Sequence, residues 1–382
     1  MKQFWLDSVE CTGCGACACA CPVNAIAMEE DGSGFIYPRI AEACIDCNAC
    51  ERVCKARAHC SGESFRQSVY ACWSMDEKVR FESTSGGAFT ELARAILREG
   101  GLVCGAVYSN VAHVIHELVS DEEGLDRVRQ SKYLQSDSGV AFRDVKAALD
   151  GGKSVLFCGA PCQVAGLKAF LKKDYSALVT VDFICRGVNS PKAYRSWLDE
   201  VERRVGARAR RVWFKYKVGG WKSSPRRTLI QFDDGRETVY DQDGNLFMEA
   251  YLGPNLFIRP SCGSCLFKGS SRVSDITLGD FWGIDTALDD DKGTSMVLVN
   301  SERGRRLFAQ SASRLVVHER NLEEMMAGNR CFDFSVEINR DSKKVLGQLG
   351  SKAFSKVVKP YLKKPLSKRM KSAMRKVLLP LG

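Results

Sequence analysis

The sequence CTGCGACACACP occupies residues 11–22, and CIDCNACERVC occupies residues 44–54. Both contain the spacing C-x2-C-x2-C-x3-C, and the second run repeats the cysteines of the first after 33 residues. A cubane iron–sulfur cluster needs four thiolates around a compact core, and closely spaced turns supply three of them from one run. The repeat therefore predicts two [4Fe-4S] clusters in preference to zinc or disulfides.

Each predicted cluster takes its fourth thiolate from the other run. The two ligand sets are Cys11, Cys14, Cys17 with Cys54, and Cys44, Cys47, Cys50 with Cys21. Two features depart from an exact repeat: Lys55 stands where the first run has Pro22, and Cys19 is an additional thiol. We expect Cys19, Cys60 and Cys72 to be bystanders.

Cysteine usage also indicates the compartment. The chain has 382 residues and 18 cysteines, of which 11 lie within the first 72 residues. A secreted disulfide scaffold can be equally dense, but regular spacing in a long chain without a signal peptide favours metal ligation. We therefore expect a protein of the reducing cytoplasm. No run of about 18 apolar residues is present, which excludes a membrane-spanning helix.

The net charge of +10 comes from the C-terminal end of the chain. Residues 342–382 contain 12 Lys and Arg and no acidic residue, so the remainder carries 44 basic against 46 acidic groups. This distribution argues against a general nucleic-acid surface. The apolar residues of the tail are spaced near helical repeats among lysines, which suits either an anionic membrane surface or a solvated tail.

Beyond the repeat, apolar strands alternate with helices and predict a largely parallel sheet. The expected strands are 102–108, 154–157 and 177–184, and the expected helices are 89–97, 142–149 and the segment ending at 171. Cys162 and Cys185 then fall at the carboxyl ends of strands, where such sheets bind ligands. Residues 212–216 and 228–232 predict an antiparallel hairpin, whose interleaved aromatic and basic residues favour a buried and a solvated face over nucleic-acid binding.

Several motifs resemble the coenzyme F-420 hydrogenase/dehydrogenase beta subunit family. They occur in the family's order as TSGGAF (84–89), KYLQSD (132–137), GAPCQVAGL (159–167), VDFICRGVNSP (181–191), RPSCGSC (259–265), SDITLGDFWGI (274–284) and KGTSMVLVN (292–300). The resemblance implies an α/β (mixed α+β) fold, with a ferredoxin-type 2[4Fe-4S] domain before a flavin- and cluster-binding domain. The expected domains are 1–62 for the clusters, 66–190 for flavin, 191–340 for the later C-x2-C, and 341–382 for the basic tail.

A C-x2-C pair alone is compatible with zinc, a redox dithiol or half of a cluster. The family resemblance implies a third [4Fe-4S] cluster held by Cys162, Cys185, Cys262 and Cys265. It also implies bound FAD, because glycines before a helix let backbone N–H groups approach a pyrophosphate. The implied flavin residues are Ser85, Gly86, Gly87, Lys132, Gln135, Ser136 and Asp280. For Lys132, a solvated surface position is the competing interpretation.

These features together predict an iron–sulfur flavoprotein oxidoreductase. Its partner is expected to be a ferredoxin-like or deazaflavin electron carrier, with no nucleic acid. The resemblance extends to chains that accompany surface-polysaccharide enzymes and so implies a role in surface-polysaccharide biosynthesis. A location in the cytoplasm at the inner face of the membrane would suit the basic tail. The alternatives are a non-catalytic electron-transfer subunit or scaffold without flavin, and a zinc-binding interaction protein. No catalytic residue is assigned.

Overall fold

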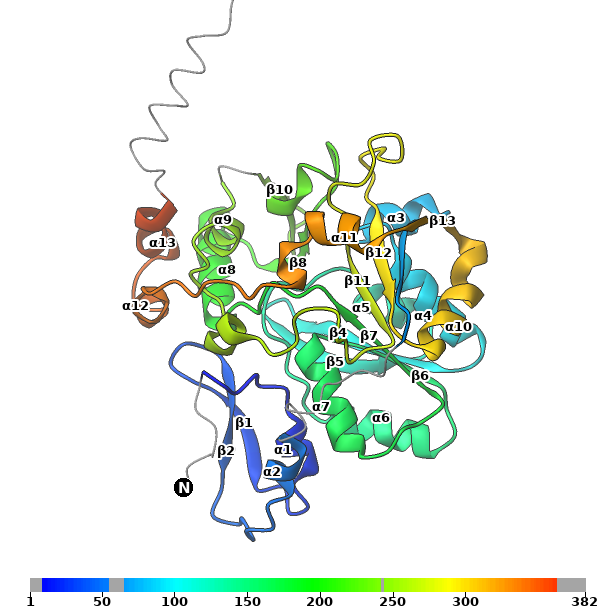
Figure 1. Cartoon of the computed structure of the whole chain (residues 1–382). Helices are drawn as coiled ribbons and strands as arrows, with labels where there is room; N and C mark the ends of the chain where they lie inside the picture. The colour runs from blue at the N-terminus through cyan, green and yellow to red at the C-terminus, as the bar shows by residue number, and fades with distance from the viewer. Residues whose placement is uncertain (1–8, 55–64, 242–243, 363–382) are drawn as a thin grey trace, which may run out of the picture.

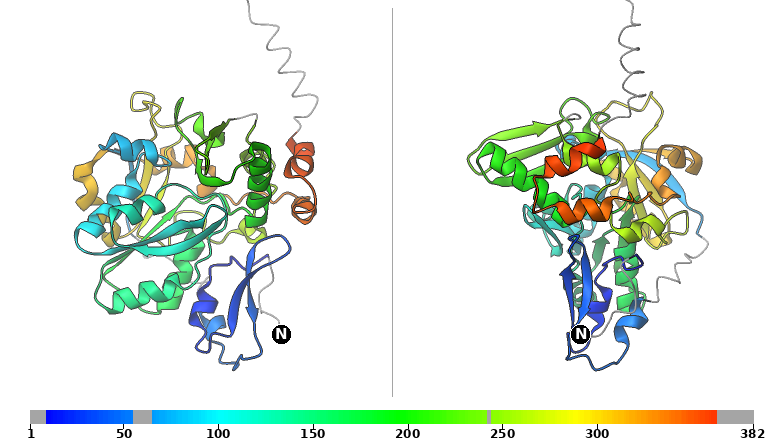
Figure 2. Two further views of the ribbon diagram at one scale, coloured as in Figure 1. Left: turned by 180° about the vertical axis from the view of Figure 1, so that it is seen from behind. Right: turned by 90° about the vertical axis from the view of Figure 1, so that its left-hand side faces the viewer.

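The computed structural model describes residues 9–54, 65–241 and 244–362. The cysteine repeat folds as two short helices beside an antiparallel hairpin, which form the lower end of the molecule in Figures 1 and 2. The elements are α1 (Ala16–Ala20), β1 (Ile26–Glu30), β2 (Ile36–Ile40) and α2 (Ala49–Cys54). The Asp31 side chain accepts hydrogen bonds from the backbone N–H groups of Ser33 and Phe35 and so closes the hairpin turn.

An eight-stranded sheet forms the centre of the molecule, in the order β13-β3-β12-β11-β7-β6-β4-β5. The strands are β3 (Ser68–Ser74), β4 (Leu102–Asn110), β5 (His113–Val119), β6 (Val155–Cys158), β7 (Leu178–Phe183), β11 (Ile276–Asp280), β12 (Ser295–Val299) and β13 (Leu315–Arg320).

The expectation of a largely parallel sheet is wrong. Only β4, β6, β7 and β11 pair in parallel, and the four pairings toward the two edges are antiparallel. The β4–β5 connection is a tight turn, and so short a connection permits only antiparallel pairing. The expected parallel pattern is thus confined to the centre of the sheet.

Helices cover both faces of the sheet. The helices are α3 (Glu77–Glu82), α4 (Ala88–Arg98), α5 (Glu122–Val128), α6 (Ala141–Asp150), α7 (Pro161–Leu171) and α10 (Glu302–Ser311), followed by α11 (Leu322–Gly328). On one face, Leu92 of α4 and Leu307 of α10 share a buried cluster with Leu156. On the other face, α6 and α7 pack over Phe157, the next residue of the same strand. Because successive side chains of β6 point to opposite faces, this strand packs against the helices on both sides of the sheet.

A second sheet of three antiparallel strands stands beside the first. Its strands are β8 (Ala209–Phe214), β9 (Thr228–Phe232) and β10 (Glu237–Tyr240), with α8 (Pro191–Val205), α9 (Leu246–Leu252), α12 (Ser342–Gln348) and α13 (Phe354–Leu362) packed nearby. The expected pairing of residues 212–216 with 228–232 is confirmed as β8 against β9. The turn at 233–235 connects β9 to a third strand, β10.

The first part of the basic tail is folded against the protein. In α13, Phe354, Val357 and Val358 are buried in the same cluster as Trp197 and Phe247. These apolar side chains therefore contact the protein core and not a membrane or solvent. The rest of the tail, from residue 363, lies outside the described residues, as do Lys55 and Cys60. Within the described segments, no helix is long and apolar enough to cross a membrane.

Candidate functional site

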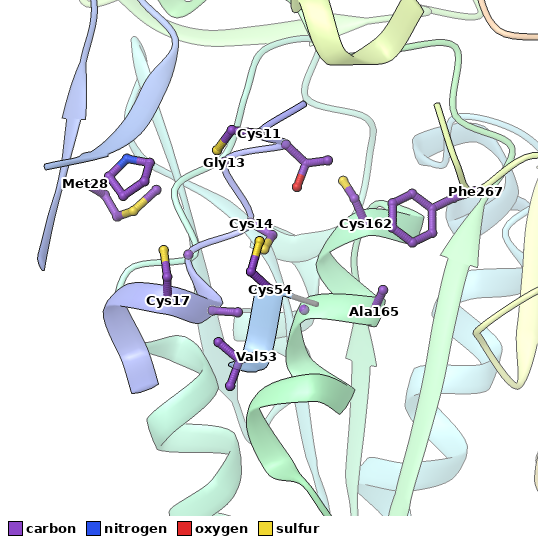
Figure 3. A pocket seen from close by; sticks show the side chains of 15 residues that line it. Cys11, Gly13, Cys14, Cys17, Met28, Val53, Cys54, Cys162, Ala165 and Phe267 are labelled. Atoms are coloured by element: carbon purple, nitrogen blue, oxygen red, sulfur yellow. The ribbon is translucent and has the colours of Figure 1, made fainter. Parts of the chain in front are cut away.

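The first predicted thiol set surrounds a pocket between α1, α2 and α7. Figure 3 shows the sulfur atoms of Cys11, Cys14, Cys17 and Cys54 around this pocket, with Cys162 on its far side. Burial raises the pKa of Cys17 well above its ordinary value, and the neighbouring thiols Cys14, Cys11 and Cys54 raise it further. Four thiols from both halves of the repeat thus lie within electrostatic range of each other.

The second predicted set lies closer to solvent. Cys21, Cys44 and Cys50 pack around one small apolar cluster, and Cys47 is exposed. Burial raises the pKa of Cys50, and Cys21 and Cys47 add to that increase, which places these thiols near one another. This arrangement gives the N-terminal module one buried and one surface-facing set of thiols.

The third predicted set joins three separate elements. Cys162 lies in the first turn of α7, Cys185 follows β7, and Cys262 and Cys265 belong to the 3-10 turn around Pro260–Ser264. Burial raises the pKa of Cys162 well above its ordinary value, with further increases from Cys185, Cys14, Cys262 and Cys265. The four thiols line one cavity of about 800 Å³.

These thiol sets fit iron–sulfur clusters better than single ions. In the parts of the chain that the structure describes, no group of three or more Cys, His, Asp or Glu closes on a single metal ion. A cubane is several atoms wide and is held by four thiolates from its periphery. Thiols that line one pocket but do not meet at a single point therefore have the arrangement expected of cluster ligands.

The expected phosphate loop precedes α4 at the edge of the same cavity. Ser85 and Gly87 line the cavity, and Gly87 has a positive φ of 91° at the helix start. Gly86 does not line the cavity, and its backbone N–H donates a hydrogen bond to the Oγ of Ser295. A Cβ on Gly86 would lie 2.4 Å from the Cys72 carbonyl oxygen, so this glycine is needed for close packing.

Lys132 lines the cavity, but its ammonium binds carbonyl oxygens at the C-terminal end of the preceding helix, α5. The Nζ atom donates to the carbonyl oxygens of Arg127, Val128 and Arg129, each at 2.8 Å. An ammonium has three N–H donors, so these bonds use all of them. Burial lowers the pKa of Lys132 to about 7, which also disagrees with a freely solvated lysine.

Gln135 and Ser136 line the cavity with their side-chain oxygen atoms already engaged. The Gln135 Oε1 accepts hydrogen bonds from the Ile36 N–H and from Arg259 Nη1, and therefore connects the cavity wall to the N-terminal hairpin. The Ser136 Oγ accepts a hydrogen bond from Gln163 Nε2 at 3.0 Å.

A second cation in the cavity was missed from the sequence. Lys215 is only 3% exposed and forms an ion pair with Asp280, the expected site residue at the end of β11. Its Nζ lies 5.2 Å from the ring centroid of Trp282, which stacks on Trp221. A strand pattern places Lys215 on a solvated face, but β8 ends at Phe214 and Lys215 adopts a left-handed φ of 55°.

Two parts of the chain match known protein families. Residues 10–58 match the family model of the 4Fe-4S dicluster domain. Residues 152–325 match the model for the C-terminal part of the coenzyme F420 hydrogenase/dehydrogenase beta subunit. A chain of the F420-reducing [NiFe] hydrogenase complex from Methanosarcina barkeri is similar at 16% identity and a TM-score of 0.46. That similarity covers 77% of this chain and 91% of the other. No curated protein matches the sequence.

Proposed function

Because the chain belongs, over residues 152–325, to the coenzyme F420 hydrogenase/dehydrogenase beta subunit family and begins with a 4Fe-4S dicluster domain, we propose that it is an iron–sulfur flavoprotein oxidoreductase. It passes electrons between an external carrier and a substrate through FAD and three [4Fe-4S] clusters. A flavin exchanges two electrons with a substrate and single electrons with clusters, while the protein supplies position and electrostatics.

One observation carries the proposal: a single cavity is lined by both the third thiol set and the loop before α4. Cys162 and Cys185 lie on its wall together with Ser85 and Gly87. Its volume of about 800 Å³ lies in the range of sites for large organic ligands. A helix N-terminus favours a pyrophosphate at one end, and the thiols favour a cluster at the other.

The cavity also contains the groups that a reduced flavin needs. Among the described residues, the Lys215 ammonium donates a hydrogen bond only to Asp280, and it therefore retains N–H donors for a ligand. A cation beside the ring system stabilises the negative charge that reduction places there. We assign this role to Lys215 in place of Lys132, whose three donors serve carbonyl groups.

The thiol sets outline an electron route from the cavity to the surface. Cys14 of the first set contributes to the raised pKa of Cys162, so the first and third sets are neighbours. The second set includes the exposed Cys47, which gives an external carrier access. The carrier is a ferredoxin-like protein or a reduced deazaflavin. We also propose a glycan-linked substrate in surface-polysaccharide biosynthesis, and this part of the proposal rests on the motif resemblance alone.

Anaerobic purification followed by iron, sulfide and flavin analysis tests this function. We expect about twelve irons per chain and close to one FAD. Reduced ferredoxin, NADH and reduced deazaflavin are then added in turn, and the physiological type of donor bleaches both flavin and cluster absorption. Iron and sulfide without flavin would establish the alternative of an electron-transfer subunit. A colourless protein that contains zinc would contradict both.

A further inference from the structure

Arg259 is a completely buried cation between two of the thiol sets. Its side chain has no exposed surface, and its hydrogen bonds in the described segments go to neutral oxygen atoms and not to a carboxylate. A buried charge without a counter-charge is strongly unfavourable, so such groups are almost always paired. The question is therefore which negative charge balances this guanidinium.

The contacts of Arg259 reach both sides of the boundary between the N-terminal module and the body of the protein. Its Nε donates to the carbonyl oxygen of Cys11 at 2.9 Å, and its Nη1 donates to the carbonyl oxygen of Ile36 and to Gln135 Oε1. The guanidinium lies 4.1 Å from the ring centroid of Tyr37. All of these groups are neutral, and Nη2 has no partner in the described structure.

The same arginine belongs to the turn that carries the third thiol set. Its carbonyl oxygen accepts a hydrogen bond from the N–H of Cys262 at 3.0 Å. Arg259 thus contacts the backbone of Cys11 through its side chain and the backbone of Cys262 through its own carbonyl oxygen.

The N-terminal module is shaped to accept this side chain. Gly13 lies between the first two cysteines of the first run, with a φ of 69°. A Cβ at that position would lie 3.0 Å from Arg259 Nη1 and 2.5 Å from Gln135 Nε2. The loop therefore needs a glycine where the arginine enters.

We propose that Arg259 is an electrostatic link between the first and third clusters, whose negative charge balances it and whose reduction it favours. This role rests on the proposed clusters. Four thiolates around a [4Fe-4S] core leave a net negative charge that increases by one when an electron is gained, and net charge is one determinant of the reduction potential. A fixed cation between two clusters therefore raises the reduction potentials of both.

Two variants test the charge in different ways. Arg259→Met removes it, whereas Gln135→Glu leaves the guanidinium and its hydrogen bond in place and adds a carboxylate beside it. Both are purified anaerobically as the full chain and titrated with dithionite under EPR detection. We expect the potentials of the first and third clusters to become more negative in both variants. The potential of the second cluster should not change, and Arg259→Lys should retain the wild-type potentials of all clusters.

Iron content separates this inference from the function on which it rests. If the Arg259→Met variant loses iron, the test rests on Gln135→Glu. The reduction potentials of this variant, with all of its iron present, then decide whether the charge of Arg259 matters. Unchanged potentials of both clusters in Gln135→Glu overturn the role of Arg259. Wild-type protein with all of its iron but no flavin contradicts the proposed flavoprotein and leaves the arginine testable. Wild-type protein without iron would overturn both.

Discussion

Cys14 of the N-terminal module and Gly166 of α7 are in direct contact. A Cβ on Gly166 would lie 2.9 Å from the Cys14 sulfur and 3.2 Å from its Cβ. The glycine therefore lies in the motif at 159–167 for a reason of packing: only a residue without a side chain lets the first thiol set approach α7. The first pocket and the body of the protein are built as one site.

Replacement of Gly166 by valine should displace the first cluster. An added side chain overlaps a sulfur whose position is set by iron, so we expect a loss of about four irons per chain. Gly347→Val is the matched control, because Gly347 is also helical and has nothing within 4 Å of an added Cβ. Iron analysis and EPR of both variants provide the measurement. Full iron in Gly166→Val would show that Cys14 is not a ligand.

The double replacement Cys262→Ser and Cys265→Ser tests the third cluster. Hydroxyl groups are poor substitutes for thiolates, so the variant should lose about four irons while both N-terminal clusters remain. Cys331→Ser is the control, since Cys331 lines the same cavity but is outside the predicted set. Equal iron in the double variant and the control would leave only two clusters in the protein.

The grouping of the thiols could be expected in part from local spacing and strand ends, whereas Cys262 and Cys265 were implied by the family resemblance alone. A run such as 11–21 can supply ligands only to nearby pockets, and Cys162 and Cys185 follow adjacent parallel strands, as the alternating pattern indicated. The central strands β4, β6 and β7 were equally predictable, from apolar runs.

Long-range packing could not be predicted in the same way. The three antiparallel strands β3, β12 and β13 pair across more than two hundred residues of chain, and no local pattern specifies such a partner. Lys215 and Arg259 are polar in sequence and are expected on a surface. Their burial depends on Asp280 and on the N-terminal hairpin, which only the folded chain brings near.

Lys215→Met should weaken flavin binding or shift the flavin potential to more negative values. The variant removes one cation from the cavity wall and leaves Asp280 with an unpaired negative charge there. Lys132→Met is the comparison, because Lys132 binds only helix carbonyl oxygens in the structure. Flavin content and flavin potential are measured for both. A larger effect of Lys132→Met on either quantity would indicate that Lys132, and not Lys215, is the cation beside the flavin.

Lys217 should make the stability of the protein depend on pH. Burial lowers its pKa from 10.5 to about 7, with help from the charges of Lys215 and Arg80. Between those values the unfolded chain binds more protons than the folded chain, so the free energy of unfolding should rise with pH, by at most about 1.4 kcal/mol per unit. Anaerobic urea denaturation from pH 7 to 9 measures this slope.

Lys217→Met should reduce that slope by the share of Lys217, while Lys132, whose pKa burial also lowers to about 7, still loses a proton on folding. Lys173→Met is the matched control, since the Lys173 side chain is 63% exposed. Parallel slopes for Lys217→Met and the wild type would contradict the predicted titration.

Asp182→Asn should be the most destabilising of these changes. Asp182 is fully buried and pairs with Arg272 at 2.8 Å, while Arg272 also donates to the carbonyl oxygen of Phe267, two residues after Cys265. Loss of the carboxylate leaves a buried guanidinium without its counter-charge, at a cost of about 3–5 kcal/mol. Glu30→Gln breaks the half-exposed Arg195–Glu30 pair and should cost about 1 kcal/mol or less. Anaerobic urea denaturation compares the two variants, and equal midpoints would show that the buried pair does not hold the Cys265 loop to β7.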